Sequence, residues 1–580
     1  MTKSTTTHKF QVDLGGIIAL LSQNLYSTPG VYVRELLQNA VDAIAARDAF
    51  DGQPAPRSIE VSPLGTTMPG SSADELSVHD QGIGIELAQV EEFLATVGAS
   101  SKRDDIAAYR RNFIGQFGIG LLSCFLIADE ITVVSRCASG TPAISWTGAS
   151  TGTYSVSLID DDLPVGTTVS LRPRPEMVSW ARAEQVCALA GKYAEFLPAV
   201  VSVITSSGSR TVTRDFPYTD FDKHRAMIRS GSGVVLYGGL RVEQQFDAFP
   251  VTIPSTGTSG VIYITDTERA TVRSHHNRIY VNNMLVSDSD RSLLPDWGFF
   301  AWCVVNSTGL KPTASREAVA EDDALDKTRQ ALGAAVERWL AELSSFDPLR
   351  FALFVYANEA SLKEAATATP ELAAILIPEL QMETTQGRMK MDDIVAASPT
   401  VLYSDSTTDF RRIAAFAPNG RLVVNAGYIN DVRIIEALPV VFPGTEVTYV
   451  HPATEIDSLA SPPADAMAAA TALETKTADV LEGIPVTVMV RVFPSANLPA
   501  IFASTEPPVH PESAKFVLNW GNRVVQALAR SMDDIVFTRA MQVLLVQARM
   551  AGQYDDDSDR RMLSSALDDL LLVAVSPNRK

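Results

Sequence analysis

The chain has 580 residues, of which 46% are hydrophobic and 20% are charged, values typical of a soluble globular protein of three or four domains. Its 48 basic and 68 acidic residues give a net charge of −20, which argues against a protein whose main work is to bind nucleic-acid phosphates. The four cysteines show no CxxC spacing, and the sequence has neither an apolar leader nor 18 consecutive apolar residues. We therefore expect a cytoplasmic protein without disulfides, zinc or a membrane span.

Helix-like and strand-like patterns alternate in the first part of the chain, which predicts an α+β domain over residues 1–207. The domain begins with a helix over 31–46 and includes strands over 76–78 and 131–135.

A second mixed domain is predicted over residues 208–457, and it becomes helical from about Asp323. Its strand candidates are 234–242, 260–265, 278–286, 421–427 and 440–450. The Ala- and Pro-rich stretch 458–476 changes the composition and marks the entry into a last domain, 458–580.

The segment VYVRELLQNAVDAI, inside the first predicted helix, has apolar residues on one side and Glu35, Asn39 and Asp42 on the other. Asn39 could offer its carbonyl oxygen to Mg²⁺, a cation that accepts few protein ligands. Glu35, one turn earlier, could activate a water molecule as a general base. The same pattern is also that of a solvated helix face, and this segment alone leaves both interpretations open.

An alternating run ends at Asp80 and passes into Gly82-Ile83-Gly84. A carboxylate at a strand end can accept a hydrogen bond from the exocyclic amine of a purine, and glycines let the base approach the backbone. The pattern is consistent with an adenine contact, although an isolated Asp-x-Gly-x-Gly is also typical of a turn.

Three further glycines, Gly115, Gly118 and Gly120, precede an apolar helix-like run in RNFIGQFGIGLLSCF. Such glycines could expose backbone N–H groups at a helix N-terminus, where the helix dipole favours phosphate. No strand leads directly into this segment, which distinguishes it from the dinucleotide-binding fingerprint. Together with the two preceding segments, it predicts a site for ATP and Mg²⁺.

The order of these segments resembles the ATPase superfamily that unites type II topoisomerases, MutL proteins, sensor histidine kinases and the 90-kilodalton heat-shock chaperones. The phrases VRELLQNAVDA, DQGIGI, IGQFGIGLLSCFLIADEITVVSR and GTTVSL are most similar to the chaperones, in their short bacterial form of the high-temperature protein G type. The resemblance implies an N-terminal Bergerat-type ATPase α/β sandwich, a middle α/β domain of the ribosomal protein S5-like type and a small C-terminal α/β dimerisation domain. It also implies a stress-response chaperone that hydrolyses ATP slowly and remodels proteins as a dimer clamp.

The resemblance assigns a role to individual residues. Glu35 would activate water, Asn39 would bind Mg²⁺ and phosphate, Asp80 would contact adenine, and Phe125 would pack against the nucleotide. A mobile lid would lie near residues 96–120. The remaining nucleotide contacts would come from Gly82, Gly84, Lys102, Gly115, Gln116, Phe117, Gly118, Gly120 and Thr167.

The text around TASREAV resembles the chaperones' middle domain, in which a loop ending Ser-Arg-Glu delivers an arginine, here Arg316. Its guanidinium would neutralise charge in the transition state of phosphoryl transfer. Thr313 and Ala320 stand where the family carries asparagine and glutamine, which bears on how tightly the loop engages ATP. Gln38 stands where the family carries a small hydroxyl residue. The alternative for Arg316 is a surface residue that caps a helix.

The resemblance is weaker beyond about residue 330, but the end of the chain looks like the family's dimerisation domain. The last predicted helix has an apolar stripe made by Leu563, Ala566, Leu567, Leu570, Leu571 and Ala574. We expect a homodimer through this domain and non-native client proteins as partners. No tetratricopeptide co-chaperone is expected, because the chain ends in SPNRK and not in an acidic motif.

Two other functions remain open at this stage. A DNA-handling ATPase of the MutL or gyrase type would use the same nucleotide site, but the acidic charge and Arg316, where those families offer lysine, favour the chaperone. A binding scaffold with a weak ATPase is suggested by Thr313 and Ala320.

Overall fold

The structure is a computed structural model that describes most of residues 28–575 in two compact units, Met1–Val336 and Glu337–Lys580. Inside that range the description leaves out 55, 67–71, 91–93, 95–119, 161, 217–220, 231–234, 237–239, 242–244, 266–276, 314, 419 and 505–513. Within the described residues, no helix combines the length and the apolar character needed to cross a bilayer. The mixed α+β multidomain architecture expected from the sequence is confirmed.

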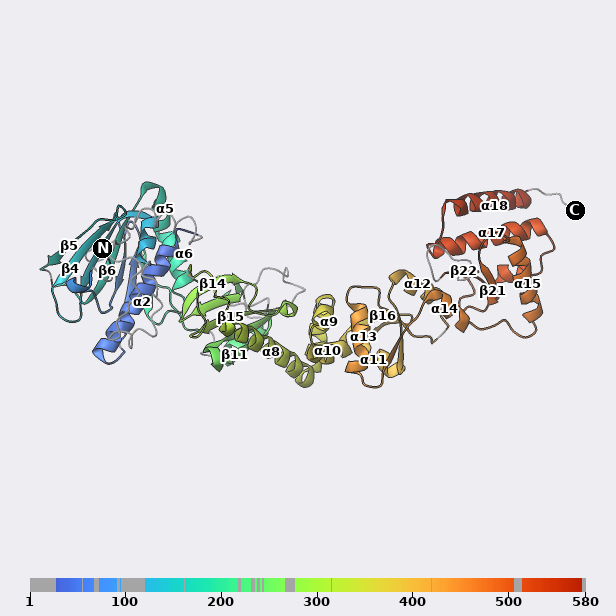
Figure 1. The fold of residues 1–580 in the computed structure, drawn as a ribbon, viewed down its shortest axis with the longest axis horizontal. Helices are drawn as coiled ribbons and strands as arrows, with labels where there is room; N and C mark the ends of the chain where they lie inside the picture. The colour runs from blue at the N-terminus through green and yellow to red at the C-terminus, as the bar shows by residue number, and fades with distance from the viewer. Residues whose placement is uncertain are drawn as a thin grey trace, which may run out of the picture. The chain divides into compact units, whose positions relative to one another are not determined.

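The first unit begins with an eight-stranded sheet in the order β5-β4-β3-β6-β2-β1-β7-β8 (Figure 1). Its strands are β1 (Ser58–Ser62), β2 (Leu76–Asp80), β3 (Ala128–Arg136), β4 (Ala143–Ala149), β5 (Tyr154–Ile159), β6 (Gly166–Pro173), β7 (Val200–Thr205) and β8 (Gly208–Thr211). The helical segments that accompany it are α2 (Val31–Asp51), η2 (Leu87–Gln89), η4 (Leu121–Leu126), η5 (Pro175–Met177), α5 (Val178–Ala181) and α6 (Ala183–Tyr193). Side chains alternate across the strands, so that Ile131 and Val133 of β3 are buried in the core beneath the helices.

Helix α2 is the element that positions the candidate site. It contacts β2, η4 and α6, and its first eight residues, 31–38, are all buried. It ends at Gly52, whose φ of 77° provides the left-handed conformation common after a helix C-terminus. A helix buried around its whole circumference is an internal element, so its polar side chains must find partners inside the protein.

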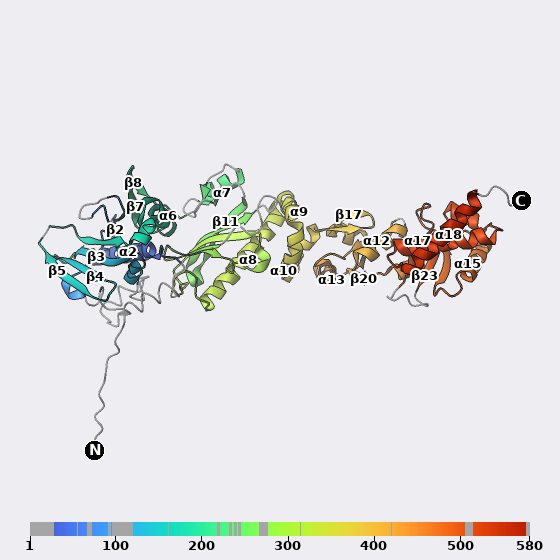
Figure 2. The same cartoon turned by 90° about the horizontal axis from the view of Figure 1, so that it is seen from above.

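A second sheet of the first unit has five strands in the order β11-β12-β15-β13-β14. Its strands are β11 (Gln245–Ile253), β12 (Thr258–Thr265), β13 (Asn277–Val281), β14 (Met284–Asp290) and β15 (Ala301–Ser307). The remaining elements of this part are α7 (Phe221–Ser230), β9 (Val235–Leu236), β10 (Leu240–Arg241), η8 (Pro254–Thr256), η9 (Asp296–Gly298) and the start of α8 (Asp323–Phe346). Helix α7 packs along β11 (Figure 2).

Two segments predicted as single strands each contain two antiparallel strands. Residues 234–242 contain the short pair β9 and β10. Residues 278–286 are a hairpin of β13 and β14. The turn consists of Asn282 and Asn283, with φ values of 47° and 69°. Asparagine tolerates this left-handed conformation, and two such residues in succession make the tight turn that antiparallel strands prefer. The Asn-Asn pair was therefore a turn signal inside an apolar run.

The two sheets of the first unit are joined through a buried polar and aromatic cluster. Glu195, 1% exposed, accepts a hydrogen bond from the hydroxyl of Tyr280 at 2.9 Å and pairs with Arg214 at 2.7 Å and Arg278 at 3.6 Å. The ring of Phe196 lies 4.9 Å from that of Tyr280. The buried carboxylate and the rings come from both sides of the junction, so this cluster links the segment that follows α6 to β13 of the second sheet.

The second unit contains a five-stranded sheet, β17-β16-β19-β18-β20, and a three-stranded sheet, β21-β23-β22. The strands are β16 (Gln381–Thr384), β17 (Gly387–Lys390), β18 (Thr400–Ser404), β19 (Val423–Asn425), β20 (Glu446–Tyr449), β21 (Thr487–Arg491), β22 (Ala500–Ala503) and β23 (Lys515–Asn519). The helical segments are α9 (Pro348–Ala365), α10 (Pro370–Leu376), η10 (Ile377–Glu379), α11 (Met391–Ala397), α12 (Thr407–Phe416), α13 (Asp431–Val441), α14 (Pro452–Glu455), η11 (Ile456–Ser458), α15 (Met467–Val480), α16 (Arg523–Leu528), α17 (Asp534–Ala551) and α18 (Asp557–Val575).

The strand predicted over 440–450 is wrong in its first part. Val440 and Val441 form the last turn of α13, and only Glu446–Tyr449 is a strand, β20. Helix α13 packs into the core through Ile434, Ile435 and Leu438, and Val441 continues this spacing, whereas Val440 is exposed. A β-branched pair followed by Pro and Gly resembles the start of a strand when the preceding helix period is overlooked.

Candidate functional site

The carboxylate of Glu35 lies inside the protein between two arginines. Glu35 and Arg34 are each 2% exposed, and Glu35 Oε1 accepts hydrogen bonds from Arg34 Nε at 3.3 Å and Nη2 at 3.1 Å. Glu35 Oε2 pairs with Arg316 Nη1 at 2.8 Å. The helix side that carries Glu35 is therefore not a solvated face, although Asn39, one turn later, is exposed.

The loop that carries Arg316 is a tight turn docked on α2. Arg316 N donates to Thr313 O, and Thr313 N donates to Ala318 O, each at 2.9 Å. Arg316 itself has a φ of 56°, a left-handed conformation that non-glycine residues adopt only where the surroundings hold it. Arg34 supplies such a hold, because its Nη1 donates to Arg316 O at 3.0 Å and its Nη2 to Ser315 O at 2.8 Å.

The side chain of Arg316 is 7% exposed and reaches the polar side of α2. Its Nη1 donates to Glu35 Oε2 and, in a very short contact, to Gln38 Oε1. This arrangement does not match the alternative of a surface arginine that caps a helix. Two stretches far apart in the sequence thus meet at one carboxylate.

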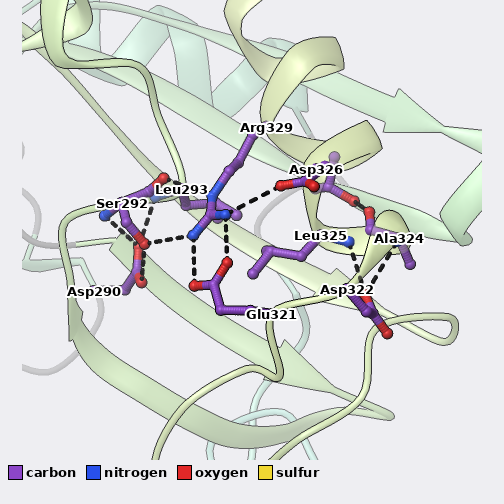
Figure 3. A network of polar contacts seen from close by, with 10 residues as sticks. Asp290, Ser292, Leu293, Glu321, Asp322, Ala324, Leu325, Asp326 and Arg329 are labelled. Carbon is purple, nitrogen blue, oxygen red and sulfur yellow. Dashed lines mark hydrogen bonds and ion pairs between the residues drawn. The ribbon is translucent and has the colours of Figure 1, made fainter.

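The chain leaving the loop is fixed by a polar network at the start of α8 (Figure 3). Arg329 pairs with Glu321 through Nη1–Oε2 at 2.7 Å and Nη2–Oε1 at 2.9 Å, and its Nε donates to Ser292 O at 3.0 Å. Asp322 Oδ1 accepts from Ala324 N and Leu325 N, each at 3.1 Å, and so caps the first turn of α8. The fork of Arg329 therefore ties Glu321, just beyond the loop, to the β14 end of the second sheet.

Asp80 lies at the end of β2 and is 6% exposed. Its Oδ1 accepts a hydrogen bond from Gly82 N at 2.8 Å, and the backbone of Thr167, its partner across the β2–β6 ladder, also bonds to the carboxylate. Burial raises the pKa of Asp80 to about 7, although these backbone donors act to lower it. In this environment, a further hydrogen-bond donor, such as an amine, would strongly stabilise the ionised carboxylate.

The glycines around Asp80 are places where a side chain would not fit. A Cβ on Gly82 would lie 2.4 Å from Cβ of Ala43 on α2, and one on Gly84 would lie 2.1 Å from the carbonyl oxygen of Arg136. Gly84 also has a φ of 77°. These contacts pack the backbone after β2 against α2 and against the end of β3, and only glycine allows so close an approach.

The other sequence-predicted site residues fall into two groups. Gly120 lies beside Glu35, since a Cβ there would be 2.8 Å from Glu35 Oε2; Phe125 is 4% exposed in the core; and the hydroxyl of Thr167 lies 2.9 Å from that of Ser135. The residues outside the described part of the chain are Lys102, Gly115, Gln116, Phe117 and Gly118, together with nearly all of the expected lid, 96–120.

Sequence reasoning missed Arg34 and the contact made by Gln38. The available signal was that Arg34, Glu35 and Gln38 interrupt a strongly apolar helix on more than one side. A polar residue on a helix that is otherwise buried requires an internal partner, and this can be anticipated without knowing which residue that partner is.

Comparison with known proteins shows which proteins the chain resembles. The model of the histidine kinase-, DNA gyrase B- and HSP90-like ATPases matches residues 26–157. Chaperone protein HtpG of Geobacter sulfurreducens is 25% identical over 384 residues, covering 59% of this chain and 58% of that protein. The HtpG proteins of Rhodopseudomonas palustris and Rhizobium meliloti are 25% and 26% identical and cover 66% and 60% of this chain, and 64% and 58% of their own lengths.

The chain is thus similar to HtpG chaperones and, in its first part, to the HSP90-like ATPases. It spans about three fifths of the length of the curated relatives it matches. The first part of the chain is an ATPase-type domain, and the matched residues include α2, Asp80 and Phe125.

The residues present fit an adenine nucleotide with Mg²⁺. At one end, Asp80 provides a buried acceptor for the amine of a base. At the other end, Asn39 offers an exposed amide oxygen one turn after Glu35. Among the described residues, no three His, Cys, Asp or Glu side chains are grouped to hold a metal.

Proposed function

We propose that this protein is an ATP-dependent molecular chaperone that binds non-native client proteins and couples slow ATP hydrolysis to a conformational cycle. The observation that carries the proposal is the meeting of Glu35 and Arg316: a buried carboxylate and a loop-borne arginine in contact at 2.8 Å. A general base beside a cation is the pair that hydrolysis of a terminal phosphate requires. The similarity of the chain to the HSP90-like ATPases and to HtpG chaperones supports this assignment.

Each residue then has one task in the reaction. Asp80 accepts the hydrogen bond of the adenine amine, and Asn39 holds Mg²⁺, which when bound neutralises charge on the phosphates. Phe125 packs against the nucleotide, and Gly82, Gly84, Gly120 and Thr167 form its near walls, joined from the lid side by Lys102, Gly115, Gln116, Phe117 and Gly118. Glu35 takes the proton of the attacking water, and the guanidinium of Arg316 stabilises charge developing on the transferred phosphoryl group, an effect of about 10³ to 10⁵ in rate in comparable enzymes.

The finer architecture is part of the proposal. Residues 1–207 form the ATP-binding domain of the Bergerat type, residues 208–457 form a middle domain of the ribosomal protein S5-like type, and residues 458–580 form a C-terminal dimerisation domain. Support for dimerisation comes from the last turn of α18, where Leu571, Leu572 and Val575 are 60%, 62% and 71% exposed. Apolar side chains so exposed at the end of a helix favour a second copy of the chain as partner. We place the protein in the cytoplasm.

The DNA-handling alternative is not favoured. A net charge of −20 opposes phosphate binding, and the relatives found are chaperones. The scaffold alternative differs from the proposed function only in whether ATP is turned over.

The test uses the full-length chain and Glu35→Gln. We expect magnesium-dependent uptake of ADP by calorimetry in both proteins, and release of phosphate from ATP that falls at least about 10²-fold in the variant, because an amide cannot accept the proton of water. Glu184→Gln on the exposed surface of α6 is the matched control and should behave as wild type. Equal turnover by wild type and Glu35→Gln, or no uptake of ADP, would exclude the proposed mechanism.

A further inference from the structure

The neighbourhood of Gln38 contains a contact with no counterpart in the motif that identified the site. Gln38 lies one turn after Glu35 on α2, so the two side chains share a face, and Gln38 is 0% exposed. Its Oε1 accepts from Arg316 Nη1, the same nitrogen that donates to Glu35 Oε2. One guanidinium nitrogen, which carries two hydrogens, is thus shared between an amide oxygen and the carboxylate.

The amide nitrogen of Gln38 has no partner among the described residues. A buried N–H group without an acceptor costs stability, so a glutamine here is a poor choice if its only task is to fill space. Its oxygen, in contrast, is engaged with a charged donor, which is the stronger class of hydrogen bond. The cost of the unpaired nitrogen and the strong bond of the oxygen together indicate that Gln38 acts on Arg316 and does not stabilise α2.

The hydrogen bonds of Glu35 explain why the contact between Gln38 and Arg316 matters. An ionised carboxylate offers about four lone-pair positions. Arg34 uses two of them on Oε1, and Arg316 uses one on Oε2. The position left on Oε2 is where a water molecule must donate its proton. If Gln38 did not accept the second hydrogen of Arg316 Nη1, the guanidinium could pivot and fill that position as well.

We propose that Gln38 is the positioning residue for Arg316, holding its guanidinium so that Glu35 keeps one acceptor position open. The inference rests on the proposed function and adds a positioning contact to the same site. It also gives the loop an anchor that does not depend on the asparagine and glutamine replaced in this chain by Thr313 and Ala320.

Gln38→Met is the variant of choice, because it keeps the length of the side chain, removes the acceptor and removes the unpaired donor, so the fold should not suffer. In the full-length, nucleotide-free chain, we expect faster hydrogen–deuterium exchange in the peptide over residues 312–319, whose amides include those of Thr313 and Arg316. With ATP, we expect kcat to fall about tenfold and KM to stay within about twofold. Gln185→Met on α6 is the matched control and should change neither measurement.

Double variants separate positioning from a structural role. In an Arg316→Met background, Gln38→Met should add no further loss of kcat, because the residue acts through the arginine. Unchanged exchange of the loop, an additive loss of kcat or a rise in kcat would each overturn the inference. If the wild-type chain does not hydrolyse ATP, the proposed function fails, and the exchange experiment still decides whether Gln38 holds the loop.

Discussion

The carboxyl group of Asp80 should make adenosine binding depend on pH. Burial raises its pKa to about 7, and the ionised form is the better acceptor for the purine amine. With that pKa, about one tenth of the molecules carry the ionised group at pH 6 and about nine tenths at pH 8. The affinity for adenosine should therefore rise about tenfold over this interval. Adenosine is the suitable probe because it has no phosphate that titrates in the same range.

Asp80→Asn should abolish this dependence and most of the binding. Oδ1 of Asp80 accepts the N–H of Gly82 at 2.8 Å, and a second backbone N–H comes from Thr167. An amide at this position turns its NH₂ group either toward a backbone donor or toward the purine amine, and two facing donors cost about 1–3 kcal/mol. Together with the lost charge-assisted bond, this corresponds to about a hundredfold weaker binding.

The measurement is calorimetry across pH 6 to 8, with ligand-observed NMR where binding is weak. Asp74→Asn, an exposed carboxylate just before β2, is the control and should follow the wild-type curve. A wild-type affinity that is flat or that falls with rising pH would refute the assignment of Asp80, as would wild-type affinity in Asp80→Asn.

Three further outcomes are expected. Gly84→Ala should lower the free energy of unfolding of the first unit by more than about 2 kcal/mol and prevent adenosine binding, because its Cβ would lie 2.1 Å from a backbone oxygen. Gly65→Ala is the control: Gly65 has a φ of 86° and open space around it, so the substitution should cost only about 1 kcal/mol. Burial acts to raise the pKa of Asp247, but hydrogen bonds from two arginines of α7 outweigh it and hold that pKa well below its usual value. Asp247 therefore contributes stability above its unfolded pKa of about 3.9 that is lost as the pH falls below it, and Asp247→Asn should be less stable by about 2 kcal/mol at pH 7 in thermal unfolding, with the difference vanishing in acid. Serine at both Leu571 and Leu572 should convert a dimer to a monomer in light scattering without changing the circular dichroism, and an unchanged mass would rule out α18 as the interface.

The sequence predicted the local features well where one period dominated. The start of α2 and the end of β2 at Asp80 follow from apolar spacing and from glycines that break it. Three strand predictions were wrong. The segments 234–242 and 278–286 each contain two antiparallel strands, and at 278–286 the Asn-Asn turn interrupts the apolar run. The first part of 440–450 continues the preceding helix, which only the period of that helix reveals.

At the candidate site, the sequence alone identified Glu35 and Arg316 as separate candidates, each with an ordinary alternative. It could not show that they touch, because helical periodicity reports which residues share a face and not what lies opposite that face. The partners of Arg34 and Gln38 could not be identified for the same reason.

What the sequence by itself determined is the set of chemical groups and their order along the chain: a carboxylate and an amide on one helix, a second carboxylate before two glycines, and an arginine in a distant loop. Only the tertiary structure decided that the first carboxylate is buried between Arg34 and Arg316 and that an amide shares the second arginine. Local sequence determines conformation over a few residues. Contacts between residues as far apart as 34 and 316 depend on how the two sheets of the first unit pack, which is a property of the whole fold.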